Sequence, residues 1–454
     1  MWAAHHQVVL IGTGLAGLSA AHELQEKYYI NATLFEARER SGGCVYTERN
    51  LANNATMEHG GCFIDSDHEA IIQLTQEMGC SLRRVINDKK ALYHQFIDNK
   101  LSNSDDNFER FRPFLEALSL DMVAYIFQDI YFINKIKNIY LSDYLDSKKI
   151  PTELKKLINL TIQNEYGADI DNMWAYELFQ VISLAINKKI FSLNGELGDE
   201  AFIIDNGGDK LILKLEQSLK NKINYGYELI SISQENNYYR LNFKNNHEII
   251  SVTSDYIIIT VPVEVLRESV VFEIKDFPNY LHEFMKRRHC GNNIKTCLFF
   301  SEPIWNTLEN GNRFNLLTEH FWIWDNSDLD KNQNCFGLTA FAGGSNALRA
   351  STLLDAEIEN EILDSLSKYI PNVRAFHVMT KRGHNWLNDP FSRGSYAGIV
   401  EPGLYPVEEA YVRPFFNNLF FAGAAWSKEF EGFMNGAVVT GKAAALRLFK
   451  TMKK

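Results

Sequence analysis

Val8-Val9-Leu10-Ile11-Gly12-Thr13-Gly14-Leu15-Ala16-Gly17-Leu18, near the start of the chain, joins an apolar run to the pattern G-x-G-x-x-G. The apolar run predicts a buried strand, and residues 19–24 after it predict a helix. Gly12 permits a tight turn, Gly14 lets a backbone approach a pyrophosphate, and Gly17 lets helix and strand pack closely. The first N–H groups of such a helix have no partner within it and can bind phosphate. The stretch therefore predicts a strand, a turn and a helix built around a phosphate site.

A second predicted strand strengthens this interpretation. Ala32–Phe35 is followed by Glu36, which stands nineteen positions after Gly17. An acidic residue at about this spacing binds the ribose hydroxyls of a dinucleotide. Because the glycines, the strand and the acid occur together, we interpret the unit as dinucleotide-binding rather than as a strand-turn-helix without a nucleotide.

The length and composition are those of a folded globular protein with more than one domain. The chain has 454 residues, of which 46% are hydrophobic and 23% charged, so two or three domains are expected. The net charge of −11 argues against a nucleic-acid-binding surface. No stretch has the length of a membrane span, and we expect no signal peptide, because residues 1–7 are too few to form one before the first predicted strand. We expect a cytoplasmic protein that binds neither nucleic acid nor membrane.

The cysteines favour neither a metal site nor a disulfide framework. The six cysteines are scattered along the chain, and no two of them form a C-x-x-C pair. We therefore predict no metal ion and a reducing compartment.

The rest of the chain predicts helical and strand-rich regions in turn. Residues 82–190 have a mostly helical pattern, and their aromatic and aliphatic residues at helical spacing predict core faces. These residues are Phe108, Phe111, Phe114, Leu118, Tyr125, Ile126, Tyr131 and Phe132. Strands are expected at 223–232, 239–243, 255–261, 294–300, 335–341 and 419–423, and helices at 68–78, 355–369 and from 435 onward. This order implies that one domain is assembled from the beginning, middle and end of the chain.

Five further blocks follow the first stretch. They are Glu36-Ala37-Arg38-Glu39-Arg40-Ser41-Gly42-Gly43, Met57–Ile64, Gly207-Gly208-Asp209-Lys210-Leu211, Trp386–Tyr396 and Leu419–Ala437. In this order the blocks resemble those of the flavin-dependent amine oxidases, a family that includes monoamine, polyamine and L-amino-acid oxidases and histone lysine demethylases. The resemblance covers nearly the whole chain, and six ordered blocks are far more specific than one glycine pattern.

The resemblance implies an α/β protein of two domains. An FAD-binding Rossmann-like domain would be assembled from residues 1–81, 205–275 and 375–454. An inserted α+β substrate-binding domain, partly helical, would comprise residues 82–204 and 276–374.

The resemblance also implies that the cofactor is FAD rather than NAD. The pyrophosphate would lie over the first glycines, and Glu36 would bind the adenosine ribose. The N-terminus of the last helix would face the flavin and stabilise its reduced, anionic form. The residues expected to contact FAD are Gly12, Gly14, Leu15, Ala16, Gly17, Glu36, Ala37, Arg38, Gly42, Gly43, Gly60, Gly61, Leu229, Trp386, Gly423, Ala424 and Met434.

The chain departs from the family pattern at three places near the expected FAD site. Ser395 stands where monoamine oxidases have the cysteine that is bonded to flavin, so we expect FAD to bind non-covalently. Cys44 replaces a common arginine that contacts phosphate, and Ala424-Ala425 replace an acid that commonly contacts the ribityl chain. These departures weaken the predicted FAD site without abolishing it.

Lys295 is the sharpest candidate for a catalytic residue, because it lies in a largely apolar predicted strand. Alternation along the strand places it on the same face as Cys297 and Phe299. A buried ammonium without a partner is unfavourable, and a lysine at a sheet edge or reaching solvent is the alternative. In the family, the lysine at this position holds a water against flavin N5 and assists reoxidation by oxygen. We favour this role, since Pro303-Ile304-Trp305 follows as the family pattern expects.

Tyr396 and Phe433 match the two positions at which the family places aromatic side chains in front of the flavin. They would position the amine carbon for hydride transfer to flavin N5 and exclude bulk water. Phe433 stands where a tyrosine is usual, and a core-packing role is nearly as good an interpretation. Trp322 and Trp324 could line the same cavity or pack within a sheet.

The sequence thus predicts an FAD-dependent amine oxidase that converts a small amine to an imine, then to a carbonyl product, while O2 is reduced to H2O2. The first alternative is an L-amino-acid oxidase in which Arg288 or Arg382 binds the substrate carboxylate. Arg83 and Arg84 are expected at the surface, which favours an amine. The second alternative is a degenerate FAD-binding protein with a scaffold or regulatory role.

Overall fold

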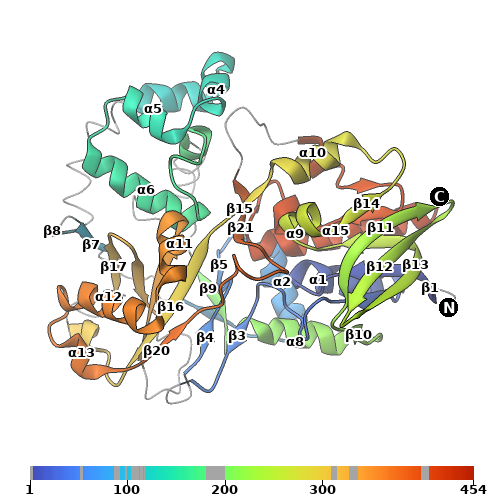
Figure 1. Ribbon diagram of the computed structural model, residues 1–454, viewed down its shortest axis with the longest axis horizontal. Helices are drawn as coiled ribbons and strands as arrows, with labels where there is room; N and C mark the ends of the chain where they lie inside the picture. The colour runs from blue at the N-terminus through green and yellow to red at the C-terminus, as the bar shows by residue number, and fades with distance from the viewer. Residues whose placement is uncertain are drawn as a thin grey trace.

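The computed structural model describes residues 4–51, 55–85, 93–97, 100–103, 112, 116, 118–179, 200–307, 314–326, 336–399 and 408–454. In this part of the chain, two large sheets form the body of the molecule and helices pack on them (Figure 1). Both chain termini lie beside the first sheet. The predicted α/β fold is confirmed.

The first sheet contains the glycine-rich stretch and is mixed. Its strand order is β10-β2-β1-β13-β12-β11-β14, and β23 and β22 extend it beside β13. The strands are β1 (Ala4–Ile11), β2 (Thr33–Phe35), β10 (Ile223–Asn224), β11 (Glu228–Glu235), β12 (Tyr238–Asn245), β13 (Glu248–Ile259), β14 (Val271–Glu273), β22 (Phe415–Phe416) and β23 (Leu419–Phe421). β1 runs parallel to β2 and β13, and β23 runs parallel to β13. Strands from the beginning, middle and end of the chain therefore lie in one sheet.

Helices cover the parallel part of this sheet, which explains why its strands are apolar runs. Val8 and Leu10 of β1 share a core with Leu24 and Leu448. These leucines belong to α1 (Leu15–Tyr28) and α15 (Met434–Met452), which lie side by side. Further helices around the sheet are α2 (Glu69–Glu77), α8 (Asp209–Ser218), α9 (Val263–Ser269), α10 (Asn279–Arg287) and α14 (Glu408–Val412).

The second large sheet has the order β20-β16-β19-β18-β17-β7-β8. Its strands are β7 (Tyr93–Ile97), β8 (Lys100–Asn103), β16 (Asn293–Phe300), β17 (Asn315–Thr318), β18 (Trp322–Asp325), β19 (Phe336–Gly343) and β20 (His377–Arg382). Between β19 and β20 the chain forms α11 (Gly344–Thr352), α12 (Asp355–Ser367) and α13 (Val373–Phe376), and the short helix η2 (Ile304–Thr307) follows β16. β20 belongs to this sheet, although the predicted FAD-binding domain includes residues 375–454. The domain boundaries stay a prediction.

The two faces of β16 contact different parts of the molecule. Leu298 and Phe300 pack in the core that includes α12, whereas Cys297 and Phe299 pack against Ala55 and Met57. The alternation that places Lys295 on the face of Cys297 and Phe299 follows from this extended strand.

Three short sheets connect the large ones. They are β5 (Phe63–Ile64), β9 (Phe202–Ile204) and β6 (Leu82–Arg84); β3 (Thr47–Glu48) with β4 (Met57–Glu58); and β15 (His289–Gly291) with β21 (Ser395–Ile399). The predicted strand at 223–232 is divided into β10 and β11 by residues 225–227.

The mostly helical prediction for residues 82–190 is wrong at its N-terminal end. Residues 118–126, α4 (Ile130–Lys137), α5 (Leu141–Ser147) and α6 (Thr152–Tyr166) are helical, but β6, β7 and β8 precede them. β6 pairs with β9 and β7 pairs with β17. These partners are distant in the sequence, so local periodicity could not reveal the strands.

The predicted helical core faces are only partly correct. Leu118 and Tyr125 are buried, and Phe132 packs against the same core. Ile126 and Tyr131, in contrast, are 58% and 85% exposed, because they lie on the other side of the helical segments from the buried residues. The predicted core residues Phe108, Phe111 and Phe114 lie outside the described residues.

No helix in the described ranges combines the length and the hydrophobicity that are needed to cross a membrane. The cytoplasmic location stays a prediction from the sequence.

Candidate active site

The glycine-rich stretch forms the predicted tight turn between β1 and α1. Gly12 has a φ of +94°, which residues with a side chain rarely adopt. A Cβ atom on Gly17 would lie 2.0 Å from the oxygen of Gly12, so only glycine allows this packing. Gly14 begins α1 without a side-chain cap, and the first turn holds no acidic residue. The N-terminus of α1 therefore offers N–H groups to an anion.

Glu36 lies beside this turn, at the end of β2. The side chain is buried, and its Oε2 accepts hydrogen bonds of 2.8 Å from both the backbone N–H and the hydroxyl of Thr13. Its Oε1 accepts a hydrogen bond from the backbone N–H of Arg38. These donors hold the carboxylate in one orientation next to Gly12. Thr13 was missed in the sequence analysis, although it lies inside the fingerprint.

Arg38 connects this first block to the C-terminal motif. Its guanidinium forms a two-pronged ion pair with Asp389, at 2.6 and 2.8 Å, and also donates to Ser392 Oγ. These interactions, together with a short His384–Asp389 contact, hold the pKa of Asp389 well below its usual range despite burial. Arg38 is thus engaged by the protein, and its position is fixed by residues about 350 positions away.

Closely packed backbone at the two glycine pairs, Gly42-Gly43 and Gly60-Gly61, connects the turn before α1 with the start of α15. A Cβ on Gly43 would lie 3.2 Å from Gly14 Cα, and one on Gly60 would lie 1.8 Å from the Cys44 oxygen. A Cβ on Gly61 would contact the side chain of Met434 at 3.4 Å. The backbone of these segments is therefore packed too closely for larger residues at Gly60. Trp386 is held against the second glycine pair, since its indole N–H donates a hydrogen bond of 3.1 Å to the backbone oxygen of His59.

The start of α15 is a second helix N-terminus without a side-chain cap. Phe433 is the cap residue, and no acidic residue lies in the first turn. Gly423 and Ala424, at the beginning of the short helix η4 (Ala424–Trp426), lie beside α15, and Gly423 exchanges hydrogen bonds of 3.0 Å with Thr440. Leu229 lies on β11, two residues after Tyr227. The backbone N–H of Tyr227 donates to the backbone oxygen of Glu36. The predicted FAD contacts are thus brought close to one another, and their roles stay predictions.

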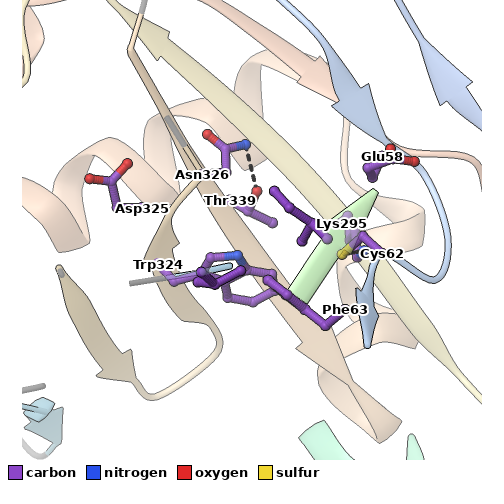
Figure 2. A pocket seen from close by; sticks show the side chains of 10 residues that line it. Glu58, Cys62, Phe63, Lys295, Trp324, Asp325, Asn326 and Thr339 are labelled. Atoms are coloured by element: carbon purple, nitrogen blue, oxygen red, sulfur yellow. Dashed lines mark hydrogen bonds between the residues drawn. The ribbon is translucent and has the colours of Figure 1, made fainter. Parts of the chain in front are cut away.

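Lys295 lies at a cavity of about 20 Å³ between the second sheet and the second glycine pair. Its Nζ donates a hydrogen bond of 2.6 Å to the Gly60 oxygen and lies 3.7 Å from Cys62 Sγ. Figure 2 shows Lys295 beside Cys62, with the side chains of Phe63 and Trp324 next to each other below them. The full lining comprises Glu58, Cys62, Phe63, Val85, Ile203, Lys295, Trp324, Asp325, Asn326 and Thr339. This space is large enough for about one water molecule.

Glu58 is a buried carboxyl group in this lining that the sequence analysis did not single out. It accepts hydrogen bonds from the Thr47 hydroxyl and, at 2.8 Å, from the Gly208 N–H. Burial raises the pKa of Glu58 to about 7, although these hydrogen bonds and the charge of Lys295 oppose the shift. A glutamate two residues before Gly60, the first residue of the second glycine pair, was the available signal.

The two tryptophans considered for the cavity lie next to each other. Both rings pack in the core of the helical region, with centroids 4.8 Å apart, and Trp324 also lines the cavity.

Tyr396 on β21 and Phe433 at the start of α15 are 41% and 40% exposed. Burial raises the pKa of the Tyr396 hydroxyl well above its ordinary value. Tyr396 has a φ of +64°, an unfavourable backbone conformation of the kind that gathers at functional sites.

The two arginines considered as ligands of a substrate carboxylate, Arg288 and Arg382, already contact other groups of the protein. Arg288 is paired with Glu431 at 2.6 Å. Arg382 donates to the oxygens of Ala350 and Leu353. Arg84 is exposed as predicted, but the Arg83 side chain is only 11% exposed and contacts Asp205 at 3.5 Å. The surface prediction for Arg83 is wrong because β6 is covered in the tertiary structure.

Comparisons with known proteins place the chain in a family. The family described as flavin containing amine oxidoreductase matches residues 15–448. Amine oxidase [flavin-containing] A of Sus scrofa is 24% identical, over 98% of this chain and 85% of that protein. Amine oxidase [flavin-containing] B of Bos taurus is 21% identical, over 98% and 86%. The structure of cyclohexylamine oxidase from Brevibacterium oxydans superposes with a TM-score of 0.84 at 19% identity, covering 99% of each chain.

Proposed function

The chain belongs to the flavin-containing amine oxidoreductase family, and from this premise we propose that it is an FAD-dependent oxidase of a small amine with an apolar body. The observation that carries the proposal is the position of Lys295, whose ammonium is hydrogen bonded to the Gly60 oxygen at an enclosed cavity. An ammonium held there lies next to the backbone expected to contact the cofactor.

The described residues fit FAD. The N-termini of α1 and α15 have no side-chain caps, so each can receive negative charge. A Cβ at Gly14 would meet nothing closer than Gly43 Cα at 3.8 Å, which leaves the helix N-terminus open to a phosphate group. Glu36 is a buried carboxylate that can also accept hydrogen bonds from ribose hydroxyls. Ser395 donates to Asn293 Oδ1 at 2.9 Å, and a hydroxyl there supports non-covalent attachment.

When bound, FAD supplies the redox chemistry, because it accepts a hydride from the carbon next to the amine nitrogen and passes the electrons to O2. The protein must orient that carbon and keep bulk water away. We assign the first task to Tyr396 and Phe433. We assign to Lys295 a positive charge and a held water molecule where negative charge develops during the reduction of O2 to H2O2.

The cavity at Lys295 has room for about one water molecule, so it matches the held water rather than the amine itself. Its apolar lining is the basis on which we propose an apolar body for an amine that binds beside it. Phe63, Val85, Ile203 and Trp324 supply apolar lining. The carboxylates of the lining have protein partners: Glu58 accepts from Gly208, and Asp325 accepts from the Trp305 indole N–H at 2.8 Å. The ion pair of Arg288 and the backbone contacts of Arg382 argue against the amino-acid alternative.

The purified protein tests this proposal directly. Flavin absorbance in its visible spectrum is expected, and acid precipitation should release the yellow colour into the supernatant. Anaerobic addition of alkyl or arylalkyl amines should bleach the flavin, whereas amino acids should not. Colourless protein would favour a scaffold role, bleaching by amino acids alone would favour the amino-acid oxidase, and colour that stays in the pellet would contradict non-covalent binding.

A further inference from the structure

Buried Arg288 and partly exposed Glu431 form an ion pair that no part of the proposed chemistry uses. Arg288 is 3% exposed, and its guanidinium nitrogens lie 2.6 and 3.0 Å from the two Glu431 carboxylate oxygens. The guanidinium also lies over the rings of Phe284 and Tyr411, at 5.0 and 5.2 Å. The Tyr411 hydroxyl donates to Glu431 Oε2 at 3.0 Å. Burying such a pair is unfavourable enough that apolar residues of similar volume often serve stability equally well.

The location of the pair suggests what it does. Arg288 directly precedes β15, in which Gly291 pairs with Ser395 of β21, and Tyr396 is the next residue. The contact between these strands is close, since a Cβ on Gly394 would lie 2.4 Å from Cys290 Cβ. Because β15 and β21 are tightly packed, a displacement of Arg288 would also displace Tyr396.

Glu431 is connected to the second aromatic residue in a similar way. It precedes Phe433 by two positions, and the intervening Gly432 has a φ of +80°. Glycine is conformationally permissive, so Gly432 alone does not fix the position of Phe433. A contact that holds Glu431 in place restricts it. The Phe433 ring itself contacts His68, with ring centroids 5.1 Å apart. The ion pair thus joins the segment that carries Tyr396 to the segment that carries Phe433.

We propose that Arg288 and Glu431 are positioning residues that set the placement of Tyr396 relative to Phe433 and thereby determine which amine bodies fit between them. The Arg288 guanidinium donates a hydrogen bond to Glu431 Oε2 and has a second nitrogen 2.6 Å from Oε1. Such a charge-assisted contact is directional, which an apolar contact is not. The inference rests on the proposed function, since it assumes that both aromatic side chains face the substrate.

The test compares Glu431→Gln and Arg288→Lys with the wild-type, flavin-loaded protein. The readout is the ratio of kcat/KM for benzylamine to kcat/KM for n-butylamine, which does not depend on the fraction of active enzyme. We expect the ratio to fall by on the order of tenfold, because a flat ring depends on both aromatic side chains and small misplacements are costly to rate. KM for benzylamine should rise more than KM for n-butylamine, and the double variant should lose little more than the worse single variant.

The chain offers a matched control in Arg349 and Glu361, another two-pronged ion pair, at 2.7 and 2.6 Å, between α11 and α12. Arg349→Lys and Glu361→Gln should leave the ratio unchanged. The proposal is overturned if the site variants keep the wild-type ratio within twofold, or if the control variants change it equally.

If the wild type oxidises no amine, the proposed function fails on its own, and calorimetric binding of two quaternary cations still tests the positioning role. Affinity for benzyltrimethylammonium relative to butyltrimethylammonium should then fall in Glu431→Gln. An unchanged affinity ratio would overturn the inference.

Discussion

Lys295 Nζ donates a hydrogen bond of 2.6 Å to the backbone oxygen of Gly60. This contact joins β16 of the second sheet to the glycine pair that follows β4, so a residue of one large structural unit is held against the other. It also explains how an ammonium is accommodated in an otherwise apolar strand, because the charge has a carbonyl partner and a small cavity beside it.

Lys295→Met should slow reoxidation of the reduced flavin by oxygen by about tenfold or more, the scale for losing one preorganised charge near a reacting centre. Anaerobic reduction by an amine should change less, and FAD should stay bound. Stopped-flow measurement of both half-reactions distinguishes these effects. Lys381→Met is a suitable control, since Lys381 lies on the adjacent strand β20 and pairs with Glu48 at 2.9 Å. Equal reoxidation rates in Lys295→Met and the wild type would leave Lys295 a structural role only.

Gly14→Val should yield folded protein without flavin. Gly14 has a φ of −65°, which valine can adopt, and its Cβ would have no close protein neighbour, so the new side chain would occupy the space expected for the pyrophosphate. Gly17→Ala is the contrasting variant, because its Cβ would lie 2.0 Å from the Gly12 oxygen. Flavin content and circular dichroism should show lost flavin with retained fold in the first variant and lost fold in the second. Full flavin content in Gly14→Val would contradict the assigned pyrophosphate site.

Tyr396→Ala should lower the rate of anaerobic flavin reduction by on the order of tenfold, because the substrate loses one of the two side chains that orient it. Alanine has the same difficulty with a φ of +64° as tyrosine, so the variant changes the side chain and not the backbone preference. Reduction should be measured at saturating amine and compared with Trp322→Phe, which alters a tryptophan in the neighbouring helical core. A rate equal to that of the wild type would show that Tyr396 does not contact the amine.

Glu58 should make the stability of the protein depend on pH. Its pKa is about 7 in the folded protein against an ordinary value of 4.5, so between these values the folded protein holds a proton that the unfolded chain has lost. The free energy of unfolding therefore falls as pH rises from about 4.5 to about 7, by on the order of 3 kcal/mol from this group. Below pH 4.5 the contribution is fully present.

Urea unfolding of wild type and Glu58→Gln at pH 5 and pH 8 measures this contribution. The variant should gain stability relative to the wild type at pH 8. His59, whose burial lowers its pKa to about 4, and Glu431, whose burial raises its pKa to about 7, titrate in both proteins and therefore cancel in the comparison. The same pH dependence in both proteins would show that Glu58 is ionised throughout this range.

Local sequence was sufficient for the parts of the protein whose chemistry is contained in short segments. The turn at Gly12, the close packing at Gly17 and the carboxylate of Glu36 follow from steric and hydrogen-bonding needs of a few neighbouring residues. The alternation of β16 likewise predicts the shared face of Lys295 and Cys297, because strand geometry has a period of two residues.

Tertiary structure alone decided what depends on partners distant in the sequence. β6 and β7 became strands because β9 and β17 pair with them, and Arg83 lost its expected exposure for the same reason. Arg288 is committed to Glu431, 143 positions away, and Lys295 to Gly60, 235 positions away. Local periodicity carries no information about such pairs, since which polar group meets which is determined when separate segments pack together and each buried charge must find a partner.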